Sequence, residues 1–163
     1  GYIRLTSNTN SIVEATWQHI LITSDDSEHQ NGLKIYIDGS DESDGATGSS
    51  YTASENDSTD LYIGRGVTTS SGTIGTSYSY ITGDMANIAF WDAELNAGHA
   101  AALYSSGRNL DIANSGIFPS NLQASWKFAE QTGTTVADSS GNGNTATFGD
   151  GSTATTYPTW AEE

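Results

Sequence analysis

Short runs in which apolar and polar residues alternate dominate this chain, and Gly, Asn and Asp residues separate them. Residues 33–38 (LKIYID) alternate Leu and Ile with Lys, Tyr and Asp, which predicts a strand with one face in the core and Tyr36 on the solvent face. Residues 17–23 (WQHILIT) carry apolar side chains on both faces, which predicts an interior strand. The Asn31-Gly32 and Asp38-Gly39 pairs favour tight turns, so the two strands are expected to form an antiparallel hairpin.

The same pattern predicts the other elements. One helix is expected from about Asn96 to Tyr104, because Asn96 can cap its first turn and Gly107 is placed to end it. Residues 66–79 are rich in Gly, Ser and Thr, which predicts an exposed, mobile loop. Further strands are predicted at residues 61–64, 85–91, 121–129 and 145–148.

The composition fits a single strand-rich domain and limits the classes of partner that it can bind. A chain of 163 residues with 35% hydrophobic residues suits many short strands and long polar loops. Its 20 acidic residues against 5 basic ones give a formal net charge of −15, which disfavours nucleic acid and anionic membranes as partners. No apolar run reaches membrane-span length, and Cys is absent, which excludes disulfides and a cysteine nucleophile. We therefore predict an all-β fold: an antiparallel β-sandwich of jelly-roll type with one short helix.

Four motifs resemble a known family when they are read in order. They are Trp17–Thr23 (WQHILIT), Leu33–Gly39 (LKIYIDG), Leu61–Gly64 (LYIG) and Ala101–Tyr104 (AALY). Together they resemble a laminin-G-like module of the concanavalin A-like lectin/glucanase superfamily. The resemblance implies a concanavalin A-like sandwich and a role in adhesion or carbohydrate recognition.

A fifth motif lies in an unexpected place. Residues 126–144 (WKFAEQTGTTVADSSGNGN) resemble the first strand and first loop of such a module, although they follow its closing helix. Either the chain spans two tandem modules, or one domain is permuted and the Trp126 strand pairs within the same sandwich. We favour the second interpretation, with a sandwich over 1–148 that is incomplete at its N-terminus and a polar tail or linker over 149–163.

The family's early strands are missing under either interpretation. A sandwich short of strands has open edges, so we expect other copies or a neighbouring domain to cover them. The C-terminal arrangement also resembles laminin-G-like segments in structural proteins of aquatic phages, which implies an extracellular, cell-surface or virion-surface location. The residues that carry this second resemblance are Tyr104, Ser106, Gly107, Asp111, Trp126, Phe128 and Glu130.

The fifth motif contains the candidate metal ligands. Carboxylate and amide oxygens on a loop with Gly residues suit Ca²⁺, and related modules hold a structural Ca²⁺ near this loop. The family's acidic pair on the closing strand is replaced here by Ala86-Asn87, with only Asp84 nearby. The alternative is that Asp138 and the Asn residues cap turns of their own backbone. The candidate ligands are Glu130, Asp138, Asn142, Asn144 and Asp84.

Exposed aromatic residues are the candidates for sugar binding, because sugar sites combine an aromatic platform with polar hydrogen-bonding groups. The candidates are Tyr78, Tyr80, Tyr51 and Tyr62, and the alternative is that these tyrosines fill faces of the sandwich. Trp17, Trp91 and Trp126 are predicted to be core residues.

No catalytic constellation can be recognised. The superfamily's glucanases place carboxylates at alternate positions of one strand, and no such Glu-x-Asp-x-Glu run occurs here. The leading prediction is therefore a non-catalytic adhesion module of an extracellular or viral structural protein that binds a glycan or surface polysaccharide. The alternative is an architectural subunit of a fibre, tail or capsid decoration that assembles through open sheet edges without a small ligand.

Overall fold

The computed structural model describes residues 3–27, 29–48, 61, 63–67, 78–116, 120–149 and 159–160. The chain divides into two compact units, Gly1–Ala53 with Ala86–Glu163, and Ser54–Met85. All strand pairings among the described residues are antiparallel, and the same residues include one α-helix. These features confirm the predicted all-β fold class. No helix in the described ranges is long and apolar enough to cross a membrane.

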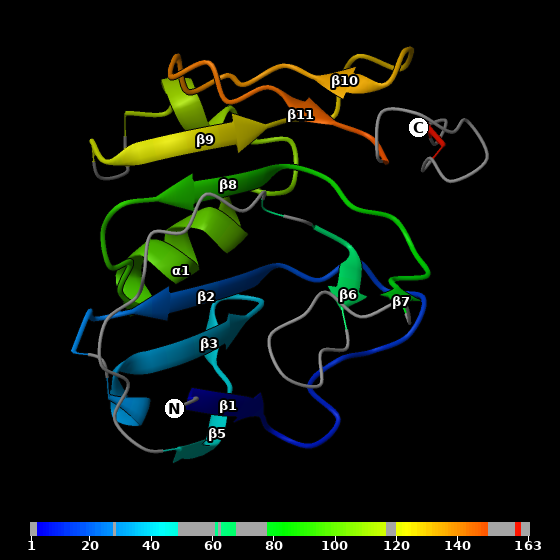
Figure 1. Cartoon of the computed structure of the whole chain (residues 1–163). Helices are drawn as coiled ribbons and strands as arrows, with labels where there is room; N and C mark the ends of the chain where they lie inside the picture. The colour runs from blue at the N-terminus through cyan, green and yellow to red at the C-terminus, as the bar shows by residue number, and fades with distance from the viewer. Residues whose placement is uncertain are drawn as a thin grey trace. The chain divides into compact units, whose positions relative to one another are not determined.

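The larger unit contains most of the elements (Figure 1). Its strands are β1 (Ile3–Ser7), β2 (Ile20–Ser24), β3 (Leu33–Ile37), β4 (Ser40–Asp41), β5 (Ser43–Gly48), β8 (Ile88–Trp91), β9 (Leu122–Trp126), β10 (Thr135–Val136) and β11 (Ala146–Thr147). Its helices are α1 (Ala97–Ser105) and the 3-10 helices η1 (Gln30–Gly32) and η2 (Ile112–Asn114). The smaller unit contains β6 (Arg65–Val67) and β7 (Tyr78–Tyr80), which pair with each other.

β2 and β3 form the predicted hairpin, and β4 adds a third strand. Leu21 lies opposite Tyr36 in the register, and both side chains are buried in one cluster with residues of α1. The prediction that Tyr36 faces solvent was therefore wrong, because the helix covers this face of β3. Asp38 (φ 51°) and Gly39 (φ 79°) turn the chain into β4. A Cβ on Gly39 would lie 3.2 Å from Cα of Ala101, so glycine lets this turn approach the helix closely.

α1 begins and ends as predicted. The Asn96 side chain accepts a hydrogen bond from the backbone N–H of His99 (3.1 Å), and the His99 Nδ1 atom accepts one from the backbone N–H of Asn96 (3.2 Å). This reciprocal pair satisfies amide donors that the first turn leaves free. At the other end Gly107 adopts φ 77°, and its N–H donates to the carbonyl of Tyr104 (3.0 Å).

One face of the helix builds the first core cluster, where α1 lies beside β2 and β8 (Figure 1). The backbone N–H of Leu95 donates to the buried Thr23 hydroxyl (3.0 Å), which ties the approach to the helix to β2. The buried members are Leu21, Tyr36, Leu95, Ala100, Leu103 and Ile112.

β8 and β9 pair although 30 residues separate their ends in the sequence (Figure 1). Ile88 lies opposite Trp126 in the antiparallel register. The strand ends after Trp126, and Phe128 then adopts φ 60°, outside the range of a strand. The permuted-domain interpretation requires this pairing of β9 with β8. The predicted domain limits, 1–148 and 149–163, stay a prediction.

The β10–β11 hairpin packs against β9 in a second cluster. Its buried members are Ala124, Trp126 and Val136, and partly buried Phe128, Phe148 and Trp160 surround them. The Trp160 ring lies 5.0 Å from that of Phe148, and its Nε1–H donates to the carbonyl of Gly133 (3.0 Å). Residue 160 therefore packs on the domain, although it belongs to the segment predicted as a polar tail or linker.

The surroundings of β2 differ from the prediction. Trp17, predicted to be core, precedes β2 and is 51% exposed. Ile20 and Ile22 are 54% and 67% exposed, although apolar residues on both faces had predicted an interior strand. α1 covers only the face of β2 that carries Leu21. Whether the opposite face is buried depends on which other element packs on it, and the strand's own sequence does not determine that.

Several strand limits also differ. The strand predicted at 61–64 begins at Arg65 instead, and Tyr78–Tyr80, predicted to lie in a loop, form β7. β8 is shorter than predicted, because Asn87 adopts φ 52° immediately before Ile88. The short strand β10 was not predicted.

Candidate ligand-binding site

Asp138 organises the loop that follows β10. Its Oδ1 atom accepts hydrogen bonds from the backbone N–H groups of Ser125 and Ser140, both at 2.9 Å. Its Oδ2 atom accepts from the Ser140 hydroxyl (2.8 Å) and from the backbone N–H of Asn144 (2.9 Å). Burial alone would raise the pKa of this carboxyl, but these hydrogen bonds outweigh it and lower the pKa of Asp138 to about 2.

The other loop residues also bind backbone. Asn142 Nδ2 donates to the carbonyls of Leu122 (2.9 Å) and Gln123 (3.0 Å), and Asn144 Nδ2 donates to the carbonyl of Gln123 (2.9 Å). These bonds fasten the loop to the start of β9. Glu130 Oε1 accepts from the backbone N–H of Ala137 (2.8 Å) and so braces the preceding turn.

This donor set fits calcium poorly. Ca²⁺ takes about six to eight oxygen ligands, whereas N–H and O–H donors already surround both carboxylate oxygens of Asp138. The Asn142 and Asn144 amides direct their nitrogens to carbonyl groups. Within the described ranges no three His, Asp or Glu residues are grouped to hold a metal ion. Calcium at this loop stays a prediction that the hydrogen bonds do not favour.

The remaining predicted site residues lie outside this loop. Asp84 is exposed and belongs to the 54–85 unit. Tyr78 and Tyr80 belong to β7, but their side chains, like Tyr51 and Tyr62, lie outside the described part of the chain. The predicted tyrosine platform is therefore neither supported nor contradicted.

A hollow of about 270 Å³ lies beside the Asp138 loop, and the sequence did not reveal it. η2 and the residues after it form one wall, Ser140 and Asn142 form another, and half-buried Trp91 of β8 also belongs to the lining. The described lining is Trp91, Ile112, Ala113, Ser115, Gly116, Ser120, Leu122, Ser140 and Asn142.

The described lining combines Trp91 and aliphatic residues with residues that carry hydroxyl and amide groups, which is the composition of a small polar-ligand site. Hydrogen bonds hold the polar rim in place: the Ser115 hydroxyl donates to the Ile112 carbonyl (2.9 Å), and that of Ser140 donates to Oδ2 of Asp138 (2.8 Å). A hydroxyl that donates in this way keeps lone pairs that can accept. The rim is therefore preorganised and can still bind a ligand hydroxyl.

A second hollow, of about 250 Å³, lies near β1, β3 and β5 and fits a ligand less well. Its described lining contains no aromatic ring. Lys34, which contributes to it, is paired with Asp41 at 3.2 Å. We therefore take the hollow beside Trp91 as the candidate site.

The sequence offers one signal for this site, the Ser- and Gly-bearing segment that joins α1 to β9. The site's other walls come from β8, the start of β9 and the Asp138 loop, which are distant in sequence.

Comparison with known proteins gives one family match. A family model described as Concanavalin A-like lectin/glucanases superfamily (Laminin_G_3) matches residues 1–101, which is more than half of the chain. The match confirms the resemblance carried by the N-terminal motifs, and residues 102–163 lie outside it. No curated protein and no solved structure gives a significant match.

Proposed function

Because the chain belongs to the concanavalin A-like lectin/glucanase superfamily, we propose that it is a non-catalytic adhesion module that recognises a glycan on an extracellular, cell or virion surface. The observation that carries the proposal is the hollow beside Trp91, whose described lining joins this residue to a rim of hydroxyl and amide groups. A pyranose ring offers C–H groups for an aromatic ring and hydroxyls for such a rim. The volume of the hollow suits about one sugar residue.

The charge of the site favours a neutral sugar. None of the described lining residues is charged, and the chain carries a formal net charge of −15. An anionic sugar in this hollow would be repelled by the protein as a whole without a local cation to attract it.

The same lining supports a non-catalytic role. Glycoside hydrolysis requires two carboxyl groups that flank the scissile bond, and the lining residues that the structure describes include no Asp or Glu. The neighbouring Asp138 carboxylate is occupied by four hydrogen bonds from the protein.

Filling the hollow tests the proposal. Ala113→Phe places a phenyl ring in the lining of the hollow, whereas Ala97→Phe places the same ring on the exposed first residue of α1. On an array of neutral oligosaccharides we expect the wild type and Ala97→Phe to bind the same sugars. Ala113→Phe should lose at least about tenfold in affinity, the loss expected when a bound ring no longer fits its site. Equal binding by both variants, with unchanged melting temperatures, would place the glycan elsewhere.

A second candidate function is assembly, as an architectural subunit that joins other copies or neighbouring domains. The observation that favours it is the exposed face of β2, where Ile20 and Ile22 lie on the opposite side from buried Leu21. Each of these Ile side chains would contribute about 1.5 kcal/mol or more to association if a partner fully covered it.

Light scattering after size exclusion at low micromolar concentration tests assembly. If this face joins copies, the wild type will elute as oligomers, and the double variant Ile20→Thr, Ile22→Thr will elute as a monomer. Ile12→Thr is the matched control, because Ile12 is equally exposed but lies outside the strands. If the wild type elutes as a monomer, assembly between copies is excluded, and glycan recognition remains as the supported function.

A further inference from the structure

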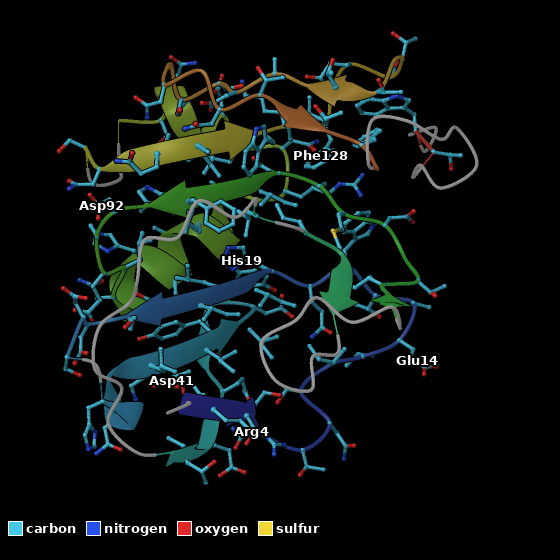
Figure 2. All side chains as sticks on the ribbon, viewed as in Figure 1. Arg4, Glu14, His19, Asp41, Asp92 and Phe128 are labelled. Atoms are coloured by element: carbon cyan, nitrogen blue, oxygen red, sulfur yellow. The ribbon has the colours of Figure 1, made fainter. Side chains whose placement is uncertain are left out.

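A second group of exposed aromatic and polar side chains lies at the C-terminal end of α1, apart from the hollow. Trp17 and Tyr104 are 51% and 49% exposed. The Tyr104 ring lies 6.5 Å from that of His19, and the Arg108 guanidinium lies over the Trp17 ring at 5.0 Å from its centroid. Figure 2 shows His19 where β2 begins, beside α1. The group Trp17, His19, Tyr104 and Arg108 is called the arginine–tryptophan cluster below.

Arg108 is a cation with no acidic partner among the described residues. Lys34 and Lys127 each form an ion pair with an Asp, but no carboxylate of the described residues lies within 4.0 Å of Arg108. The Asn87 Nδ2 atom donates to the carbonyls of Arg108 (3.0 Å) and Leu110 (2.8 Å), which fixes the backbone at this point. A guanidinium on a fixed backbone that faces no carboxylate in this part of the chain is suited to pair with the carboxylate of a ligand.

His19 is the partly buried member of the cluster. Its Nδ1 atom is shielded from solvent and has no hydrogen-bond partner in the described part of the chain. Burial lowers the pKa of His19, although the neighbouring Asp38 acts in the opposite direction. A ligand on the surface of the cluster does not reach this Nδ1 atom, so His19 contributes its ring contact with Tyr104.

We propose that the arginine–tryptophan cluster binds a carboxylate-bearing sugar residue, such as the uronic acid of an acidic glycan. The Arg108 guanidinium pairs with the sugar carboxylate through two parallel N–H···O bonds. The exposed aromatic surface of Trp17 and Tyr104 contacts the sugar ring. This inference rests on the proposed function for its ligand class, but it uses residues that do not line the hollow.

The test compares two sugars that differ only in the carboxylate, methyl galacturonide and methyl galactoside, titrated against ¹⁵N-labelled protein by NMR. We expect saturable shifts at the Trp17 indole and the Arg108 amide with the galacturonide, and none at these positions with the galactoside. Arg108→Gln, which keeps most of the aliphatic stem over Trp17, should weaken galacturonide binding at least about tenfold. Arg4→Gln is the matched control, because Arg4 is also exposed and lies in β1.

Three results would overturn the inference. They are no galacturonide binding by the wild type, equal weakening by the Arg4 and Arg108 variants, and galacturonide shifts confined to the hollow that Ala113→Phe abolishes. The last result would leave the proposed function intact. Conversely, the protein could bind the galacturonide at Arg108 but bind no neutral glycan at the hollow. That result would contradict only the proposed function of the hollow. If Arg108→Gln changes the melting temperature, Tyr104→Ala provides the second variant, with weaker galacturonide binding expected.

Discussion

Asp138→Asn is expected to lower the free energy of unfolding by about 3 kcal/mol, because hydrogen bonds to a charged group are each worth about 1.5–3 kcal/mol. Asparagine can still accept the bonds from Ser125 and Ser140 through its one oxygen. Its NH₂ group then faces the backbone N–H of Asn144, which donated at 2.9 Å to the carboxylate. Two donors therefore oppose each other where the loop joins β9. Urea unfolding followed by tryptophan fluorescence measures the difference.

The same carboxylate predicts a loss of stability in acid. The pKa of Asp138 is about 2 in the folded protein and near 3.9 in an unfolded chain. Its contribution is therefore fully present above about pH 4 and is lost as the pH falls toward 2. Asp138→Asn should show a shallower loss over this range than the wild type.

Two controls belong to this prediction. Asp92→Asn changes an exposed carboxylate and should cost less than about 0.5 kcal/mol. The melting temperature of the wild type should be the same in EGTA and in millimolar calcium, because the protein's own donors occupy Asp138. A rise in calcium that Asp138→Asn abolishes would instead establish the calcium site and contradict the hydrogen-bonded description of this loop.

Trp126→Ala is expected to cost about 3–5 kcal/mol, the range for removal of a buried aromatic side chain. Trp126 is 7% exposed in the second core cluster, where its ring meets that of Phe90 edge to face at 5.8 Å. Its Nε1–H also donates to the carbonyl of Asn144 (2.7 Å). The alanine variant therefore leaves both a cavity and an unpaired carbonyl.

Trp17→Ala is the matched control for this change. It removes an exposed ring and its contact with Arg108, so it should cost about 1 kcal/mol or less. Thermal unfolding of the two variants decides the point. Equal destabilisation would mean that Trp17 is a core residue, as the sequence alone had predicted.

Local sequence patterns predicted those elements whose cause is local. The alternation in residues 33–37 and the turn residues around them produce the β2–β3 hairpin. Asn96 and Gly107 define the ends of α1 through hydrogen bonds that span only a few residues. For the Asp138 loop, the sequence was compatible with both calcium binding and turn capping. In the first case the side-chain oxygens would bind a metal ion, and in the second they accept hydrogen bonds from the backbone.

Burial depends on contacts that a linear pattern does not contain. Trp17 and Trp126 look equivalent in the sequence, but only Trp126 lies between a strand pair and a hairpin from another part of the chain. Tyr36 lies in a polar position of its strand, yet α1 covers it. The hollow beside Trp91 combines segments that are distant in the sequence and that the pairing of β9 with β8 brings together.

The most direct test of glycan recognition at the hollow is an NMR titration of ¹⁵N-labelled protein with the neutral oligosaccharide that gives the strongest array signal. We predict saturable shifts at the amides of residues 112–116, 120 and 140–142 and at the Trp91 indole, and none of these shifts in Ala113→Phe. Shifts confined to other surfaces, or no saturable binding of any neutral sugar, would contradict the account.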